Sequence, residues 1–168
     1  MGAGDRRGAF GKRGAGEGRC RHIDEIHKKL VAEKKKAFAE WVDLDHKQAM
    51  AWLSVAEGKY DDALAILKPM ADKEDSLGEE PQGIPTREML AEILLMAKRP
   101  DQSLAEYETD LKFNPNRFNG LYGAAQAAEA AGKQEKATQY YSALVKVCSG
   151  SNSDRPELSK AKGLVAKK

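Results

Sequence analysis

The chain has 168 residues, of which 32% are charged and 7% are aromatic, and its formal net charge is +2. That length suits one domain with a tail. Residues 1–40 hold 11 Lys/Arg against 6 Asp/Glu, whereas residues 41–168 hold 17 against 20. The folded part is therefore predicted to be mildly acidic, which argues against the basic face of a nucleic-acid-binding core.

The N-terminal segment, residues 1–20, is rich in Gly, Arg and Ala. It has too few apolar side chains to offset the entropy of ordering, so we predict a disordered leader. It is superficially similar to an arginine-glycine RNA-binding tract, but Phe10 is its only aromatic residue, and a flexible leader is favoured. It also lacks the apolar stretch of a secretory signal.

The helices are predicted from apolar residues that recur at three- and four-residue steps. The first is expected over about 22–41. The next begins near Leu44 and ends at Gly58, and Asp61 can cap the helix that follows, in which Pro69 should kink the last turn. The segment 75–86 contains two Gly and two Pro and is predicted to be a loop. Later helices are expected over about 86–98, 101–113, 117–131, 134–147 and 156–165, and no strands are predicted.

Three turn-and-helix segments resemble one another: GKYDDALAILKPM, KRPDQSLAEYETDL and GKQEKATQYYSALV. In each, a small residue is followed four positions later by a large one, in the pairs Ala63–Leu67, Ser103–Tyr107 and Ala137–Tyr141. The small residues lie 40 and then 34 residues apart, and the six extra residues of the first interval fall in the loop around 78–85. A period of this length indicates a repeat architecture.

This pattern resembles the tetratricopeptide repeat (TPR) family, whose unit is a 34-residue helical hairpin. The resemblance covers three degenerate repeats at about 44–77, 84–117 and 118–150. It implies an all-α fold, a right-handed superhelical stack of antiparallel hairpins, as a single domain over 21–165 with capping helices at about 22–41 and 155–165. The sequence departs from the family at the leading aromatic position, which holds Lys47, Arg87 and Leu121.

The resemblance also assigns packing roles. Small residues allow two helices to approach closely, larger ones fill the space between successive hairpins, and a proline closes a repeat. The predicted packing residues are Ala51, Ala63, Leu67, Ala91, Ser103, Tyr107, Pro115, Ala125, Ala137 and Tyr141.

In this family the first helices of the hairpins line a concave groove that binds peptides or proteins. By register, the expected groove residues are Gln48, Trp52 and Val55, then Glu88, Glu92 and Leu95, then Asn119, Tyr122 and Gln126. Some members clamp a C-terminal carboxylate with Lys, Arg and Asn in the groove, but here those places hold Glu88, Glu92 and Gln126, so that clamp is not expected. The carboxylates and aromatic residues present suit a partner segment with apolar and basic side chains, although Trp52 could equally be a packing residue.

Catalytic and metal sites are not predicted. Cys20, His22 and His27 lie close together in the sequence, with His46 further on, but their spacing matches no zinc motif. The acidic pairs at Asp61–Asp62 and 79–80 fall in turns open to solvent, whereas general acid–base catalysis needs a carboxylate in a cleft. Cys20 and Cys148 are too few for a disulfide framework, and free thiols are favoured over one bridge. No cofactor is expected.

The sequence therefore predicts a non-enzymatic module that binds a partner protein or peptide, with no nucleic acid and no membrane span, as a monomer or a homodimer. One alternative is a structural or oligomerisation segment of a larger protein. Another is an accessory part of an enzyme whose catalytic residues lie elsewhere. The compartment stays open, with the cytoplasm as the default.

Overall fold

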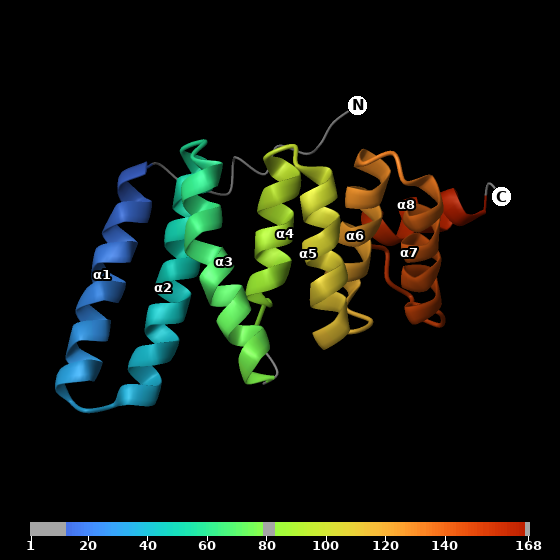
Figure 1. The fold of residues 1–168 in the computed structure, drawn as a ribbon. Coiled ribbons are helices and arrows are strands. Elements are labelled where there is room, and N and C mark those ends of the chain that lie inside the picture. The colour runs from blue at the N-terminus through green and yellow to red at the C-terminus, as the bar shows by residue number, and fades with distance from the viewer. Residues whose placement is uncertain (1–12, 79–82, 167–168) are drawn as a thin grey trace. The chain divides into compact units, whose positions relative to one another are not determined.

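The computed structural model describes residues 13–78 and 83–166, which form helices and no strands (Figure 1). These residues contain α1 (Arg13–Ala32), α2 (Lys36–Ala56), α3 (Tyr60–Leu77), α4 (Thr86–Met96), α5 (Pro100–Phe113), α6 (Phe118–Ala130), α7 (Gln134–Val147) and α8 (Pro156–Val165). They divide into two compact units, Met1–Met70 and Ala71–Lys168. The single array expected over 21–165 therefore stays a prediction, and each unit is described by itself.

The first unit contains a helical hairpin in which α1 packs on α2. Two expectations are wrong here. Residues 13–20 belong to α1 rather than to a disordered leader, of which residues 1–12 lie outside the described residues. The helix expected over 22–41 is two helices, because the chain turns at Lys34, whose φ is +56°.

The turn at Lys34 is one of four that share a hydrogen-bond pattern. The second residue after the helix adopts a positive φ, and the next residue donates its N–H back to a carbonyl five residues earlier, as in a Schellman motif. The left-handed residues are Lys34, Gly58, Lys98 and Gly132, at the ends of α1, α2, α4 and α6. The closing bonds, from Lys35 to Leu30, Lys59 to Ser54, Arg99 to Leu94 and Lys133 to Ala128, measure 2.8–2.9 Å.

Helix α3 crosses the boundary between the units and contains Pro69, two residues before the second unit begins. It continues to Leu77, so the loop expected from residue 75 starts later. The reason is that Glu74 and Asp75 are held by the start of α4. Glu74 accepts hydrogen bonds from the Thr86 N–H (3.1 Å) and hydroxyl (2.6 Å). A carboxylate at this point stabilises the N-terminus of α4.

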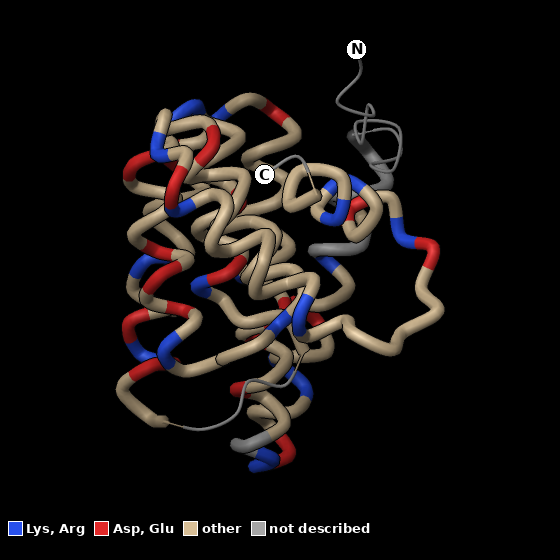
Figure 2. Tube along the Cα trace, turned by 90° about the vertical axis from the view of Figure 1, so that its right-hand side faces the viewer, with Lys and Arg blue, Asp and Glu red and all other residues tan. Residues whose placement is uncertain are grey.

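The second unit is built from stacked hairpins, and Figure 2 marks the Lys, Arg, Asp and Glu residues along the chain trace. Helix α4 packs on α5 and α6 on α7, while α5 also packs on α6, α8 on α7, and α4 contacts α6 (Figure 1). Helices α4 to α8 begin and end within about two residues of the predicted positions. Ser103 in α5 ties the first pair together, because its hydroxyl donates to the Ala91 carbonyl at 2.7 Å.

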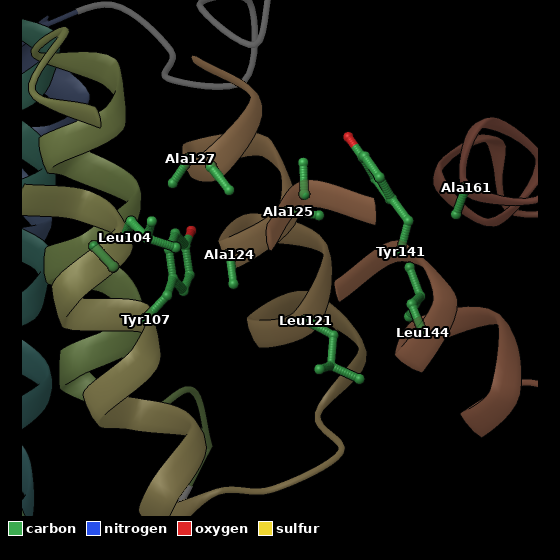
Figure 3. Close-up of a cluster of buried hydrophobic side chains, with 12 residues drawn as sticks. Leu104, Tyr107, Leu121, Ala124, Ala125, Ala127, Tyr141, Leu144 and Ala161 are labelled. Carbon is green, nitrogen blue, oxygen red and sulfur yellow. The ribbon is translucent and has the colours of Figure 1, made fainter. Parts of the chain in front are cut away.

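The core of this unit alternates alanines with large side chains. Figure 3 shows Leu104 and Tyr107 of α5 directed at the alanines of α6. The close approach also requires glycine, because a Cβ on Gly123 would lie 2.2 Å from Tyr107 Cζ. Nine of the ten predicted packing residues are buried in their respective units, and Pro115 is exposed in the turn after α5.

Candidate partner-binding face

The expected groove residues of the second unit lie on two helices that touch. Glu92 and Leu95 are half-buried on α4, and Tyr122 and Gln126 are half-buried on α6. We call these four residues the α4–α6 face. Leu95 and Tyr122 also pack against the core, so their outer atoms are held by a rigid support.

Two residues that were predicted to line the groove, Val55 and Glu88, are instead buried. Val55 is 9% exposed and belongs to the core of the first unit. Glu88 is 4% exposed, and its Oε2 accepts a 2.9 Å hydrogen bond from Arg117 Nε. Gln48 and Trp52 are half-buried in the first unit, each with an interaction of its own. A groove that continues from them to Gln126 stays a prediction.

Arg87 is a buried charged residue whose three carboxylate partners could not be predicted from the sequence. Its side chain is 6% exposed and donates hydrogen bonds to Asp72 and Asp75 of α3, each at 2.6 Å, and to Glu106 of α5. Burial alone would lower the pKa of Arg87, but the hydrogen bonds that it donates to these carboxylates hold the pKa above its ordinary value. One sign of this buried arginine is present in the sequence, because Arg87 stands at the repeat position that an aromatic residue usually takes.

A second buried polar group lies at the end of α5. Asp110 is 1% exposed, and only its Oδ1 has a partner, the side-chain amide of Asn114 at 3.0 Å. Burial raises the pKa of Asp110 to about 6, helped by the negative charges of Glu88 and Asp75 and opposed by Asn114 and Arg117. The group is enclosed by the fold, so its charge affects the stability of the chain.

The residue before α8 contacts the start of α6. The Cζ of Arg155, the residue before α8, lies 3.7 Å from the centroid of the Phe118 ring. An Nη2–H of the same guanidinium donates to Asn119 Oδ1 at 3.2 Å. Asn119 was assigned to the partner groove, and here an arginine of the chain itself binds it.

Lys160 of α8 makes a second set of contacts. Its Nζ donates to Glu129 Oε2 at 3.1 Å and lies 6.0 and 5.7 Å from the rings of Tyr122 and Tyr141. The Tyr141 hydroxyl donates to the same Glu129 oxygen at 3.0 Å. Burial alone would lower the pKa of Lys160, but Glu129 and Tyr141 raise it, and burial raises the pKa of Tyr141 to about 12. Tyr122, Tyr141 and Glu129 thus form a site occupied by a cation.

Comparison with known proteins supports the architecture. No protein-family model matches the chain, and no curated protein is similar to it in sequence. A solved structure with a matching fold is PcrH from Pseudomonas aeruginosa, at a TM-score of 0.60 and 14% sequence identity over 74% of this chain and 90% of PcrH. The chain has a TPR-like helical repeat fold. At this identity the likeness establishes the fold and nothing more.

The described part of this TPR-like fold offers little for metal chemistry. No group of three or more His, Cys, Asp or Glu side chains within it could hold a metal ion. His22 Nδ1 lies 3.8 Å from Glu25, and His46 Nδ1 lies 3.2 Å from Asp24. The Cys20 side chain and residues 79–80 lie outside the described part. No described helix is long and apolar enough to cross a bilayer.

Proposed function

We propose that the chain is a non-catalytic module that binds a segment of another protein on its α4–α6 face. The observation that carries this proposal is the adjacency of α4 and α6 in a TPR-like stack, with Glu92, Leu95, Tyr122 and Gln126 half-exposed on them. A half-exposed aromatic residue fixed on a rigid core is the usual anchor of a binding hot spot. The fold shared with PcrH supports a protein-binding scaffold.

The chemistry of the face favours a partner segment that is apolar and basic. Leu95 and Tyr122 supply apolar surface, and Glu92 supplies negative charge beside it. Glu88 adds nothing to this charge because it is buried against Arg117. Gln126 and the Tyr122 hydroxyl offer neutral hydrogen-bonding groups, and none of the four residues of the face is a cation.

The alternative, an oligomerisation segment, is favoured by a different observation in the first unit. Phe38 and Trp41 are 55% and 50% exposed and stack edge to face with ring centroids 5.4 Å apart. An exposed aromatic pair of this kind is typical of an association surface. Size-exclusion chromatography with light scattering distinguishes the two functions, because a tight dimer that dissociates on Trp41→Ala supports oligomerisation.

The binding function is tested with the double variant Tyr122→Ala/Glu92→Lys. We expect it to lose the proteins that the wild-type chain captures from its source cell, while its helicity by circular dichroism is unchanged. The matched control is Tyr140→Ala/Glu135→Lys, which makes the same two changes on α7 and should capture normally. Equal capture by both variants would show that the α4–α6 face does not bind the partner.

A further inference from the structure

Helix α8 occupies a surface that the repeat register assigns to a partner. Arg155 binds Asn119 and lies on Phe118, and Lys160 lies beside Tyr122. Between these two cations, Leu158 is 1% exposed, and Ala161 after the lysine is fully buried. Leu164 and Val165 are half-buried and pack against the core, and most of the other residues of α8 are exposed, so the helix is attached to α7 and the core through one face.

The attachment of α8 is partly polar, and the segment that connects α7 to α8 has no regular secondary structure. The side chains of Arg155 and Lys160 are 46% and 42% exposed. The segment before α8, Ser149 to Asp154, is Ser-Gly-Ser-Asn-Ser-Asp and has no helix or strand, and its side chains are mostly exposed. Flexible segments of this composition let a tethered element dissociate and rebind at an effective concentration of order millimolar.

We propose that α8 is a tethered ligand that occupies the α6 end of the partner-binding face, and that the partner is a helix of the same pattern. That pattern is an arginine, a leucine three residues later, a lysine two residues after the leucine, and then an alanine. The inference rests on the proposed function and names the partner chemistry and its regulation. The partner must displace α8 to reach Asn119, Phe118 and Tyr122, so its apparent affinity is reduced by the fraction of molecules in which α8 is docked.

The surface explains each element of the pattern. The Phe118 ring and the Asn119 amide accept a planar guanidinium, which stacks and donates at once. The Glu129 carboxylate and the Tyr122 and Tyr141 rings accept an ammonium group. Leu158 and Ala161 are buried and lie three residues apart, so they share one face of α8. The surface therefore requires a helix whose apolar face carries the two cations at its edges. Both α8 and the proposed partner satisfy these conditions.

The test uses the full chain and a fluorescent peptide of residues 153–166 with blocked ends. The chain variant Arg155→Ala/Lys160→Ala holds its own α8 less tightly, so the peptide should displace α8 more easily. Fluorescence anisotropy should then show that the peptide binds this variant about tenfold more tightly than it binds the wild-type chain. The chain variant Lys162→Ala, which changes an exposed lysine of the same helix, should behave as wild type. A peptide that itself carries Arg155→Ala/Lys160→Ala should bind the double-variant chain at least tenfold more weakly than the wild-type peptide.

Equal affinities of the double-variant and Lys162→Ala chains, or no binding of the peptide to either, would overturn the proposal, provided circular dichroism shows that both chains are folded. A wild-type dimer that the double variant converts to monomer would overturn it as well, because α8 would then occupy a second copy. If the peptide fails while Tyr122→Ala/Glu92→Lys still abolishes capture, the inference fails and the proposed function stands. If capture survives that variant while the peptide binds as expected, the proposed function fails instead.

Discussion

At the scale of single residues, Asp110 is the buried group whose state depends most on pH. Its free-peptide pKa near 3.8 rises to about 6 in the folded chain, mainly through burial. Between these values the folded state binds more protons than the unfolded state, so the free energy of unfolding decreases as pH rises from about 4 to about 6. Above pH 6 the fold carries a buried carboxylate whose Oδ2 has no partner.

We expect Asp110→Asn to stabilise the chain by about 1–2 kcal/mol at pH 7 and to have little effect near pH 4, where Asp110 is protonated. The amide keeps the acceptor that Asn114 uses and removes the buried charge. Urea unfolding at the two pH values measures the difference. The control is Asp101→Asn, an exposed substitution on the same helix, and a variant that destabilises equally at both pH values would contradict the role given to Asp110.

Residue identity predicts packing better than it predicts polar contacts. The small-large pairs such as Ala137–Tyr141 could be found from spacing, because their role is set within one helix and its neighbour. The partners of Arg87 lie 15, 12 and 19 residues away in sequence, and that of Glu88 lies 29 residues away. Such ion pairs depend on how α3, α5 and α6 surround α4, so an assignment by register placed Glu88 in the groove.

At the scale of helices, the boundaries after residue 86 follow from their turn residues, whereas the break between α1 and α2 does not. Gly58 and Gly132 mark two of the four similar turns in the sequence. Lys34 and Lys98 take the same left-handed conformation, which lysine seldom adopts. An apolar period that runs from Ile23 to Trp41 therefore concealed the turn, because lysine gives no sign of a helix end.

The turn after α4 gives a prediction at this scale. Lys98→Gly should stabilise the second unit by about 0.5–1 kcal/mol, because relief of left-handed strain of about 1–2 kcal/mol exceeds the extra entropy that glycine loses on folding. Gly132→Ala at the equivalent turn should destabilise it by about 1 kcal/mol. Space is not a factor, because a Cβ at Gly132 meets no atom within 4 Å. Thermal unfolding compares the two variants, and a lower midpoint for Lys98→Gly would contradict this account of the turn.

At the scale of the whole molecule, the repeat resemblance predicts one continuous array, and its continuity across the two compact units Met1–Met70 and Ala71–Lys168 stays a prediction. Sequence spacing locates hairpins but does not show where the chain divides into units. The second unit begins at Ala71, inside α3, and includes the residues of α3 that bind Thr86 and Arg87. The end of α3 is therefore a structural part of the α4–α8 stack rather than a connection to it.

This arrangement can be tested with two fragments, Tyr60–Lys168 and Gly83–Lys168. The shorter fragment lacks Asp72, Glu74 and Asp75, so Arg87 keeps only Glu106, and a buried charge that loses its partners typically costs about 3–5 kcal/mol. We expect the longer fragment to unfold cooperatively in urea and the shorter one to be less stable by about that amount. Arg87→Met should restore part of the stability of the shorter fragment, since it removes the unpaired charge and keeps an apolar chain in the core. If Arg87→Met instead weakens the shorter fragment, the lost stability comes from missing helix contacts and not from the arginine.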